Sequence, residues 1–307
     1  MTDRAAYELR APTPDDLGPA ASVLVADQRA AGSEVVLDAS FIRHEWDRRA
    51  FDLTTDAWVV TDDAKLVVAY AQVRSDEEGA VESWGVVHPE HRGRGIGTAL
   101  LDRIEERASV LLRDSPSPRL RHSISAGDRA AATMLRARGL RPIRHFWHMQ
   151  IDLFGPREPR PAPAGIEVGG VEPGEDIGAV HAVLTAAFSH PDERLPTLDR
   201  WADDHARSQR NDLTLWLLAR HGRVPVGALI GSTGDDGGWV DRLAVVASHR
   251  GRGVASALLQ RSFAVFARRG VRRVLLNVDA ENATGATAVY ERAGMRVVSA
   301  WDLWERA

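Results

Sequence analysis

Equivalent amphipathic segments occur near the start of each half of the chain. Residues 15–30 and 175–188 place apolar side chains at helical spacing, so each predicts a helix with one buried face. Each helix is followed by two short apolar stretches around a turn, which predict a pair of antiparallel strands. The predicted strand pairs are residues 58–60 with 66–73, and residues 213–219 with 224–230.

Both halves continue with a buried strand, a glycine-rich loop and an apolar helix. The strands are residues 84–87 and 243–246, and the helices begin at Ile96 and Val254. In the second half, a strand at 274–278 leads to a short helix that is expected to start near Asn282 and stop at Gly294, because Asn caps helix starts and Gly follows helix ends. Hairpins followed by strand–helix units predict a mixed α/β fold with a curved sheet flanked by helices.

The two halves also match residue by residue. His-Arg-Gly-Arg-Gly-Ile-Gly at residues 91–97 recurs as His-Arg-Gly-Arg-Gly-Val-Ala at residues 249–255, an offset of 158. Near the end of each half the offset is 155, because Gly139 corresponds to Gly294. The chain is therefore predicted to be a tandem repeat. Its domains are residues 1–155 and 165–307, and the proline-rich segment 156–164 is a semi-rigid linker between them.

Composition excludes several classes of protein. The longest uninterrupted apolar run has six residues, far below the ~20 needed to span a membrane, and the first residues lack a signal-peptide core. There is no cysteine, so disulfides and a cysteine nucleophile are excluded. The net charge of −4 argues against a nucleic-acid surface, even though 38 of the 39 basic residues are arginine. We expect a cytoplasmic protein, monomeric or homodimeric, that binds neither membrane nor nucleic acid.

The glycine-rich loops predict binding of a diphosphate. Glycines let the backbone turn sharply, and each loop opens into a helix whose first amides lack internal partners and favour an anion. A dinucleotide-binding loop would need glycine where Thr98 stands, and a nucleotide-triphosphate loop would need a lysine that is absent here. A plain tight turn before a core helix would explain one such loop, but it explains two loops in equivalent places less well.

Both loops fit the pattern Arg-x-x-Gly-x-Gly/Ala, which resembles the pyrophosphate loop of the GNAT acetyltransferase superfamily. The second copy also carries Leu-Asn-Val-Asp-Ala-Glu-Asn at 276–282 and Val-Tyr-Glu-Arg-Ala-Gly-Met at 289–295, which look like the downstream motif of that family. The resemblance implies two tandem GNAT-like domains, each with a splayed sheet that binds acetyl-CoA, the acetyl donor. The implied cofactor-binding residues are Leu243, Ala244, Val245, Arg250, Gly251, Arg252, Gly253, Val254, Ala255 and Asn282, with Gly85, Val86, Val87, Arg92, Gly93, Arg94, Gly95, Ile96 and Gly97 in the first copy.

The same resemblance makes Tyr290 the expected general acid. At the local offset of 155 its counterpart in the first copy is Leu135, which cannot donate a proton. Asp241 is the nearest candidate for a general base, and a salt bridge with Arg242 or another arginine is the alternative interpretation. Glu82 in the first copy is one residue out of phase with Asp241. The first copy is thus expected to keep the cofactor loop and to lack catalysis.

These features predict an N-acetyltransferase that transfers acetyl directly from acetyl-CoA to a primary amine of a small molecule or peptide. One alternative is acetylation of a cysteinyl amine, because the organisation resembles the tandem branch of the family typified by mycothiol synthase. A non-catalytic acyl-CoA sensor is the other alternative. No metal site is expected, because His145 and His148 lack a third ligand nearby in the sequence.

Overall fold

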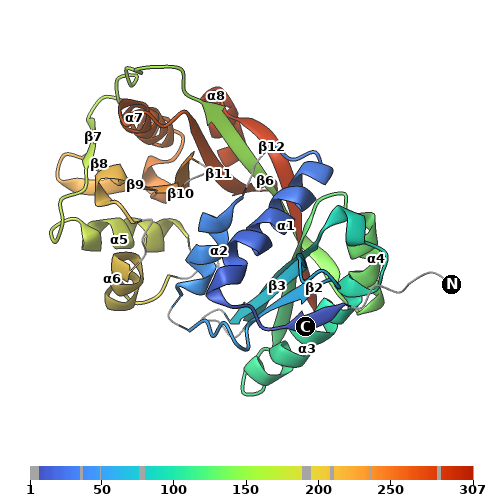
Figure 1. Cartoon of the computed structure of the whole chain (residues 1–307). Helices are drawn as coiled ribbons and strands as arrows, with labels where there is room; N and C mark the ends of the chain where they lie inside the picture. Colours follow the sequence, from blue (N-terminus) through green and yellow to red (C-terminus); the bar gives the residue numbers. More distant parts are fainter. Residues whose placement is uncertain are drawn as a thin grey trace. The chain divides into compact units, whose positions relative to one another are not determined.

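The protein is described by a computed structural model that covers residues 7–34, 37–48, 50–75, 80–188, 195–207, 211–234, 237–281 and 285–306 (Figure 1). The chain forms two compact units. Unit 1 comprises Met1–Trp147, Asp279–Glu281 and Val298–Ala307, and unit 2 comprises His148–Val278 and Asn282–Val297. Both units are mixed α/β, as the sequence predicts.

Unit 1 follows the predicted order of helix, strand pair, strand, loop and helix. Its elements are β1 (Glu8–Arg10), α1 (Leu17–Ala30), α2 (Ala39–Trp46), β2 (Ala57–Thr61), β3 (Val67–Ser75), β4 (Ala80–Val87), α3 (Ile96–Leu111), β5 (Arg119–Ser125) and α4 (Arg129–Ala137). Two long strands, β6 (Arg141–Asp152) and β12 (Arg296–Arg306), contribute residues to both units.

Unit 2 repeats this order. Its elements are β7 (Ile166–Gly170), α5 (Ile177–Ala187), α6 (Leu198–Arg207), β8 (Leu217–His221), β9 (Val224–Gly234), β10 (Gly237–Val245), α7 (Val254–Arg268), β11 (Arg273–Asp279) and α8 (Ala286–Arg292). Short 3₁₀ turns lie at Pro14–Asp16, Pro89–His91, Leu213–Leu215 and Ala247–His249. The predicted strand at 213–219 therefore begins later, because the Asp212 carboxylate accepts from the Thr214 amide and folds Leu213–Leu215 into a turn.

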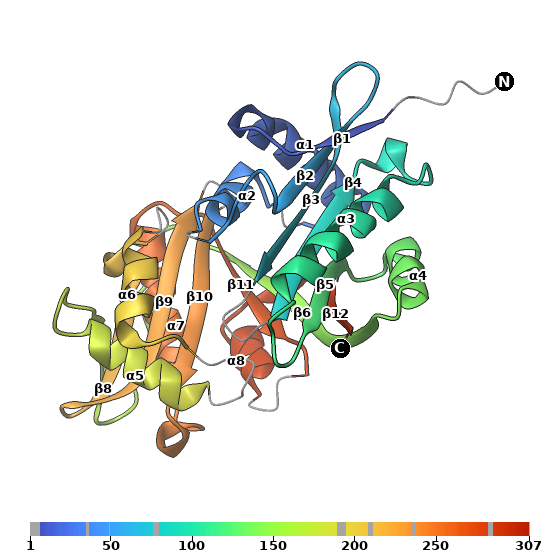
Figure 2. The same cartoon turned by 90° about the horizontal axis from the view of Figure 1, so that it is seen from below.

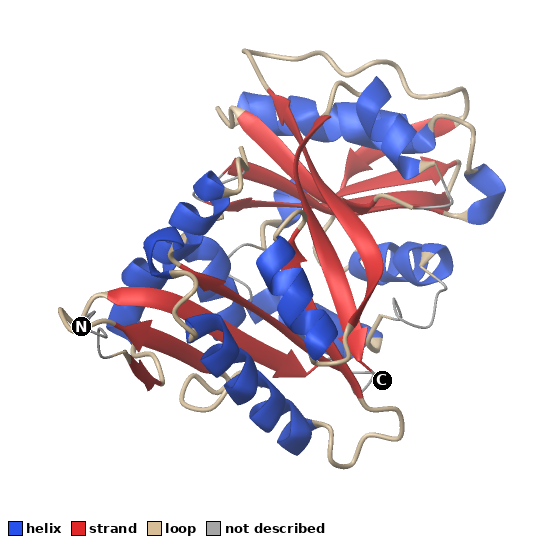
Figure 3. Ribbon diagram, turned by 90° about the vertical axis from the view of Figure 1, so that its right-hand side faces the viewer, coloured by secondary structure: helices blue, strands red, loops and turns tan. Residues whose placement is uncertain are grey.

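The sheets of the two units have the same mixed topology. The order in unit 1 is β1-β2-β3-β4-β5-β12, and the order in unit 2 is β6-β11-β10-β9-β8-β7. The registers given by the described residues are antiparallel except those of β4 with β5 and of β10 with β11, which are parallel. Helices cover both faces of the strands in the ribbon view (Figure 3). Each parallel pair is joined through the helix that follows the glycine loop, α3 or α7.

The compact units do not coincide with the sequence repeats, because the last strands are exchanged. Strand β12 ends the second repeat, yet its residues Trp301–Arg306 pair antiparallel with Leu120–Ser125 of β5 in unit 1 (Figure 2). Conversely, β6 ends the first repeat and lies next to β11 in unit 2. Each unit is therefore completed by a strand from the other repeat.

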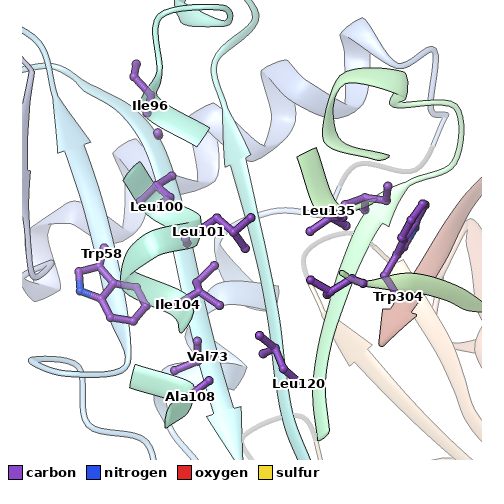
Figure 4. Close-up of a cluster of buried hydrophobic side chains, with 14 of the residues drawn as sticks. Trp58, Val73, Ile96, Leu100, Leu101, Ile104, Ala108, Leu120, Leu135 and Trp304 are labelled. Carbon is purple, nitrogen blue, oxygen red and sulfur yellow. The ribbon is translucent and has the colours of Figure 1, made fainter. Parts of the chain in front are cut away.

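The helix behind each loop forms the centre of a hydrophobic core. In unit 1, Leu101 and Ile104 of α3 are 1% exposed and pack with Leu135 of α4 and Trp304 of β12 (Figure 4). The apolar spacing in the sequence that predicted α3 thus marks its buried face. Within the described residues, no helix is both long enough and apolar enough to cross a membrane.

Candidate active site

The two glycine loops have the same backbone conformation. Gly93 and Gly95 have φ of +73° and +84°, and Gly251 and Gly253 have φ of +72° and +81°. All four lie in the left-handed region, where a side chain would be strained. Gly95 and Gly253 are the N-caps of α3 and α7. The predicted pair of loops thus forms two equivalent turns into a helix.

Each turn leaves a row of amides for an anion. The first intrahelical bonds run from Ala99 N to Gly95 O and from Ala257 N to Gly253 O, both 3.0 Å. The amides of residues 96–98 and 254–256 precede these bonds, so they have no acceptor within their own helix. Together with the helix dipole they suit a diphosphate, and these residues fit the phosphate end of a coenzyme A molecule.

The first arginine of each loop holds the loop in place. Arg92 Nε donates to Val87 O at 3.3 Å, and Arg250 Nε donates to Val245 O at 3.2 Å. The outer nitrogen of Arg92 also forms an ion pair with Asp27 at 2.5 Å. Arg92 and Arg250 were predicted as cofactor ligands. Their bonds tie the loop to the end of the preceding strand, so their structural role is to position the loop amides.

The second arginine of each loop differs between the units. Arg94 donates to the Tyr7 hydroxyl at 2.8 Å and to Glu90 O at 3.0 Å, so its guanidinium is held back against unit 1. Arg252 is exposed and forms no hydrogen bond or ion pair within the described residues. Of the two, Arg252 has the guanidinium available for a phosphate.

At the end of the strand before each loop, one backbone edge is not paired with a neighbouring strand in the described residues. Val246 N donates to Val226 O at 3.0 Å, so by alternation Leu243 and Val245 direct their amides and carbonyls away from β9, toward β11. Pairing of β10 with β11 covers only Gly238–Val240. The ladder between the two parallel strands ends at Val240, and we call the edge of β10 from Leu243 to Val245, which has no β11 partner in the described residues, the slot.

Unit 1 has the same arrangement with a shorter slot. His88 N donates to Val68 O at 2.8 Å, which turns Gly85 and Val87 toward β5. Pairing of β4 with β5 continues through Trp84. At the offset of 158, Val240 corresponds to residue 82. The pairing in unit 1 therefore continues two residues further than in unit 2, and the slot is shorter by two residues. Of the residues expected to line the two slots, Ala244 and Val86 instead turn their backbone groups toward β9 and β3.

A β-bulge interrupts β10 beside the slot. Val240 pairs with Gly231 and Arg242 pairs with Ile230, so Asp241 is the additional residue between them. In β4 of unit 1 the pairing with β3 runs from Val81 to Val87 without interruption. A bulge re-aims backbone and side-chain groups at the point where it occurs. The candidate base Asp241 lies at this irregularity and is exposed.

The corresponding position of unit 1 is closed by hydrogen bonds. At the offset of 158 Ser83 stands for Asp241, and it is 3% exposed. Its hydroxyl contacts His122 Nδ1 and Arg121 O on β5, each at 2.8 Å. Burial lowers the pKa of His122 to about 4, so its ring is neutral. Sequence reasoning compared Asp241 only with Glu82 and missed this pair; the constant repeat offset could have revealed it.

Tyr290 lies on α8 of unit 2 and is 8% exposed. Burial raises its pKa to about 12, so the phenol is protonated at neutral pH and can donate. Met295 N bonds to Tyr290 O and Leu140 N bonds to Leu135 O, both at 3.0 Å, so Leu135 occupies the equivalent turn of α4. Leu135 packs near Trp304 in the core of unit 1 (Figure 4).

The other predicted site features fall outside this cluster. Asn282 lies outside the described residues. Its counterpart region in unit 1 starts α4 with Asp128, whose carboxylate accepts from Ala131 N at 2.9 Å. His145 bonds to Asp302 at 2.6 Å, within unit 1. No three His, Cys, Asp or Glu side chains gather at metal-binding distance among the residues that the structure describes.

Comparison with known proteins identifies the class that these loops and splayed strands define. The acetyltransferase (GNAT) family model matches residues 179–295, and an acetyltransferase (GNAT) domain model matches residues 54–132. The chain belongs to the GNAT family and is an N-acetyltransferase. Each unit carries one match, as the repeat predicts.

Among curated relatives, the chain is similar to mycothiol acetyltransferases. It is 32% identical to the one from Cellulomonas flavigena over 78% of this chain and 71% of the relative. It is 34% identical to the one from Streptomyces scabiei over 74% of this chain and 72% of the relative. These matches confirm the expected resemblance to tandem members of the family.

Solved structures agree in fold. A GCN5-related N-acetyltransferase from Sphaerobacter thermophilus matches with a TM-score of 0.87 and 35% identity, covering 100% of this chain and 96% of the other. A tandem GNAT protein from the clavulanic acid biosynthesis pathway has a TM-score of 0.71, with 98% of both chains covered. At 17% identity, the latter supports the tandem fold alone.

Proposed function

We propose that the protein transfers acetyl from acetyl-CoA to a primary amine of a small molecule or peptide, and that the reaction takes place in unit 2. The observation that carries this proposal is a difference between the repeats. Both units have the diphosphate turn, but unit 2 alone combines it with a longer slot, a bulged strand and a buried tyrosine on the helix near its end, Tyr290. Binding of coenzyme A needs only the diphosphate turn, whereas acetyl transfer needs the turn, the slot, the bulge and the tyrosine together.

The chain's own groups fit acetyl-CoA along this path. The turn amides and Arg252 hold the diphosphate, and the amide and carbonyl of Leu243, with the amide of Val245, form a backbone edge for the pantetheine arm. Bound acetyl-CoA supplies an activated thioester. Backbone amides at the bulge polarise the carbonyl oxygen as it gains negative charge.

The remaining groups manage protons. The acceptor nitrogen forms a bond to the acetyl carbon and the carbon–sulfur bond breaks. Asp241 accepts the proton that the amine loses, directly or through one water. Tyr290 donates a hydrogen bond, and then its proton, to the departing sulfur. The product amide and free coenzyme A thiol leave, and the proton on Asp241 passes through solvent to restore Tyr290.

A cysteinyl amine of the mycothiol type is the second candidate acceptor. The relatives named mycothiol acetyltransferases, 32% to 34% identical over about three quarters of this chain, favour it. The panel of amines that tests the function therefore includes cysteinyl amines.

We propose that unit 1 binds coenzyme A without turning it over. It has the same turn, with Gly95 and Gly253 in matching conformations, but Leu135 stands in place of the acid. Its slot is also closed beside Ser83.

Thiol release from acetyl-CoA, measured with a panel of amines, tests the proposed function. Turnover with at least one amine is expected, together with transfer of radiolabelled acetyl to it. Tight coenzyme A binding with no turnover on any amine would instead identify an acyl-CoA sensor.

A further inference from the structure

The bulge in β10 holds two adjacent residues of opposite charge, Asp241 and Arg242. Arg242 pairs with Ile230, which packs in the core under α5 and α6. Val240 pairs with Gly231, where a Cβ would meet Phe266 of α7 on the opposite face. Asp241 is the extra residue that shifts the alternation between them. Arg242 therefore faces α5 and α6 beside the opening of the slot.

The first repeat has different chemistry at these two positions. Ser83 is buried and bonded to His122, and Trp84 packs on Phe41 and Tyr70 with ring centroids 5.7 Å and 5.2 Å away. In unit 1 this face is thus filled by its own aromatic side chains. In unit 2 both residues are charged and exposed. The charged pair thus lies in the second repeat, to which we assign acetyl transfer.

An aromatic ring lies against the arginine of this charged pair. The Arg242 guanidinium lies 5.5 Å from the Phe188 ring centroid, at the end of α5. A guanidinium over a ring keeps its planar edge of N–H donors available for a second partner. On α6, His205 Nδ1 bonds to Trp201 O at 2.8 Å.

The charges of Asp241 and Arg242 both act on His205 of α6. Burial lowers the pKa of His205, while Asp241 acts to raise it and Arg242 to lower it. His205 is therefore neutral near pH 7, and it adds no charge that would compete with Arg242 for an anion. Asp204, on the same helix, is the other acidic group that acts on His205.

We propose that Asp241 and Arg242 form an acceptor-recognition pair, which selects a primary amine that also carries an anionic group a few bonds away. This inference rests on the proposed function of unit 2. Asp241 holds the amine, and Arg242 binds a carboxylate or phosphate through paired N–H donors. A free amino acid, a peptide with a nearby carboxylate or a phosphorylated amine meets this requirement.

Matched acceptors test the inference. Acetylation kinetics of the full chain are compared for an amino acid with its amide and for phosphoethanolamine with ethanolamine. The wild type is expected to show a higher kcat/KM for the anionic member of at least one pair. The pair that shows the preference distinguishes carboxylate from phosphate recognition.

Arg242→Gln is expected to lower the anionic-to-neutral preference by about ten- to a hundredfold, mainly through KM, because a charged hydrogen-bonded contact is lost. Arg242→Lys should restore part of it. Arg268→Gln is the matched control, because Arg268 is an exposed arginine of α7 in the same unit. The preference should also shrink with added salt.

The outcomes separate the two proposals. A wild type that acetylates no amine would refute the proposed function itself. A wild type that acetylates amines with no preference for anionic members, or an Arg242→Gln variant whose preference is unchanged, overturns the acceptor-recognition pair and leaves the acetyltransferase assignment standing. The number of coenzyme A equivalents bound, measured by calorimetry in each variant and compared with the wild type, shows whether the site in unit 2 remains folded.

Discussion

Replacing Tyr290 with Phe tests the proposed acid directly. The side chain is 8% exposed and its hydroxyl forms no hydrogen bond within the described residues, so Tyr290→Phe removes one oxygen with little effect on stability. Its pKa of about 12 exceeds that of an ordinary thiol, about 8.5. Tyr290 therefore acts first by donating a hydrogen bond to the departing thiolate. Such a charge-assisted bond contributes about 1.5–3 kcal/mol, and its loss lowers kcat about ten- to a hundredfold.

Steady-state thiol release at saturating acetyl-CoA gives kcat, and calorimetry gives the affinity for coenzyme A. The affinity should be nearly unchanged, because the hydroxyl matters only when the thiolate leaves. Tyr70→Phe is the control: Tyr70 in unit 1 bonds to Trp46 and Gln72, so this variant should lose stability while keeping kcat. An unaltered kcat in Tyr290→Phe would refute the assignment of the acid.

Three other predictions follow from the two units. Calorimetry of the wild type should show two coenzyme A equivalents per chain, and Gly95→Glu should remove one and keep most activity, whereas Gly253→Glu should abolish activity; a single equivalent in the wild type would contradict this. Residues 1–155 produced alone lack the β12 strand that completes unit 1, so circular dichroism should show no cooperative thermal transition like that of the full chain; a full-chain melting temperature would show that the exchanged strand is dispensable. Burial lowers the pKa of His122 to about 4, so as the pH falls below about 6.5 this histidine takes up a proton in the unfolded chain before it does so in the folded protein. The free energy of unfolding should therefore decrease as the pH is lowered from 6.5 to 4, and it should decrease less steeply in His122→Gln. Equal pH dependence of the unfolding free energy in the two proteins would refute this role of His122.

The repeat and its turns could be predicted from the sequence because the signals are local. Glycines at a fixed spacing, followed by apolar residues at helical spacing, determine a turn into a buried helix with few alternatives. Both loops and the helices from Ile96 and Val254 are confirmed. The predicted correspondence between Tyr290 and Leu135 is also supported. The carbonyl of each residue accepts a hydrogen bond from the amide five residues later, at the end of its helix.

The exchanged strands and the bulge could not be predicted in this way. A strand's local pattern shows which face is buried, but not which of two similar edges it will join. Strands β6 and β12 end equivalent repeats, so each could complete either sheet. The bulge depends on one extra residue in β10, which a uniform offset of 158 across the surrounding strands conceals. From the sequence alone, Arg242 is therefore predicted only as a salt-bridge partner of Asp241.

The closed position in unit 1 also indicates why its activity would be hard to regain. Leu135→Tyr would restore a phenol on α4, but β4 would still be paired with β5 through Trp84. Opening that pairing would separate Ser83 from His122, which is 5% exposed, and leave a buried ring nitrogen without its partner, at a cost of about 1–3 kcal/mol. The uninterrupted register of β4 with β3 would also have to shift by one residue to leave Ser83 unpaired as a bulge. Because no single change supplies the acid, the slot and the bulge together, Leu135→Tyr combined with Tyr290→Phe should be no more active than Tyr290→Phe alone. Recovered thiol release in the double variant would show that unit 1 lacks only its tyrosine.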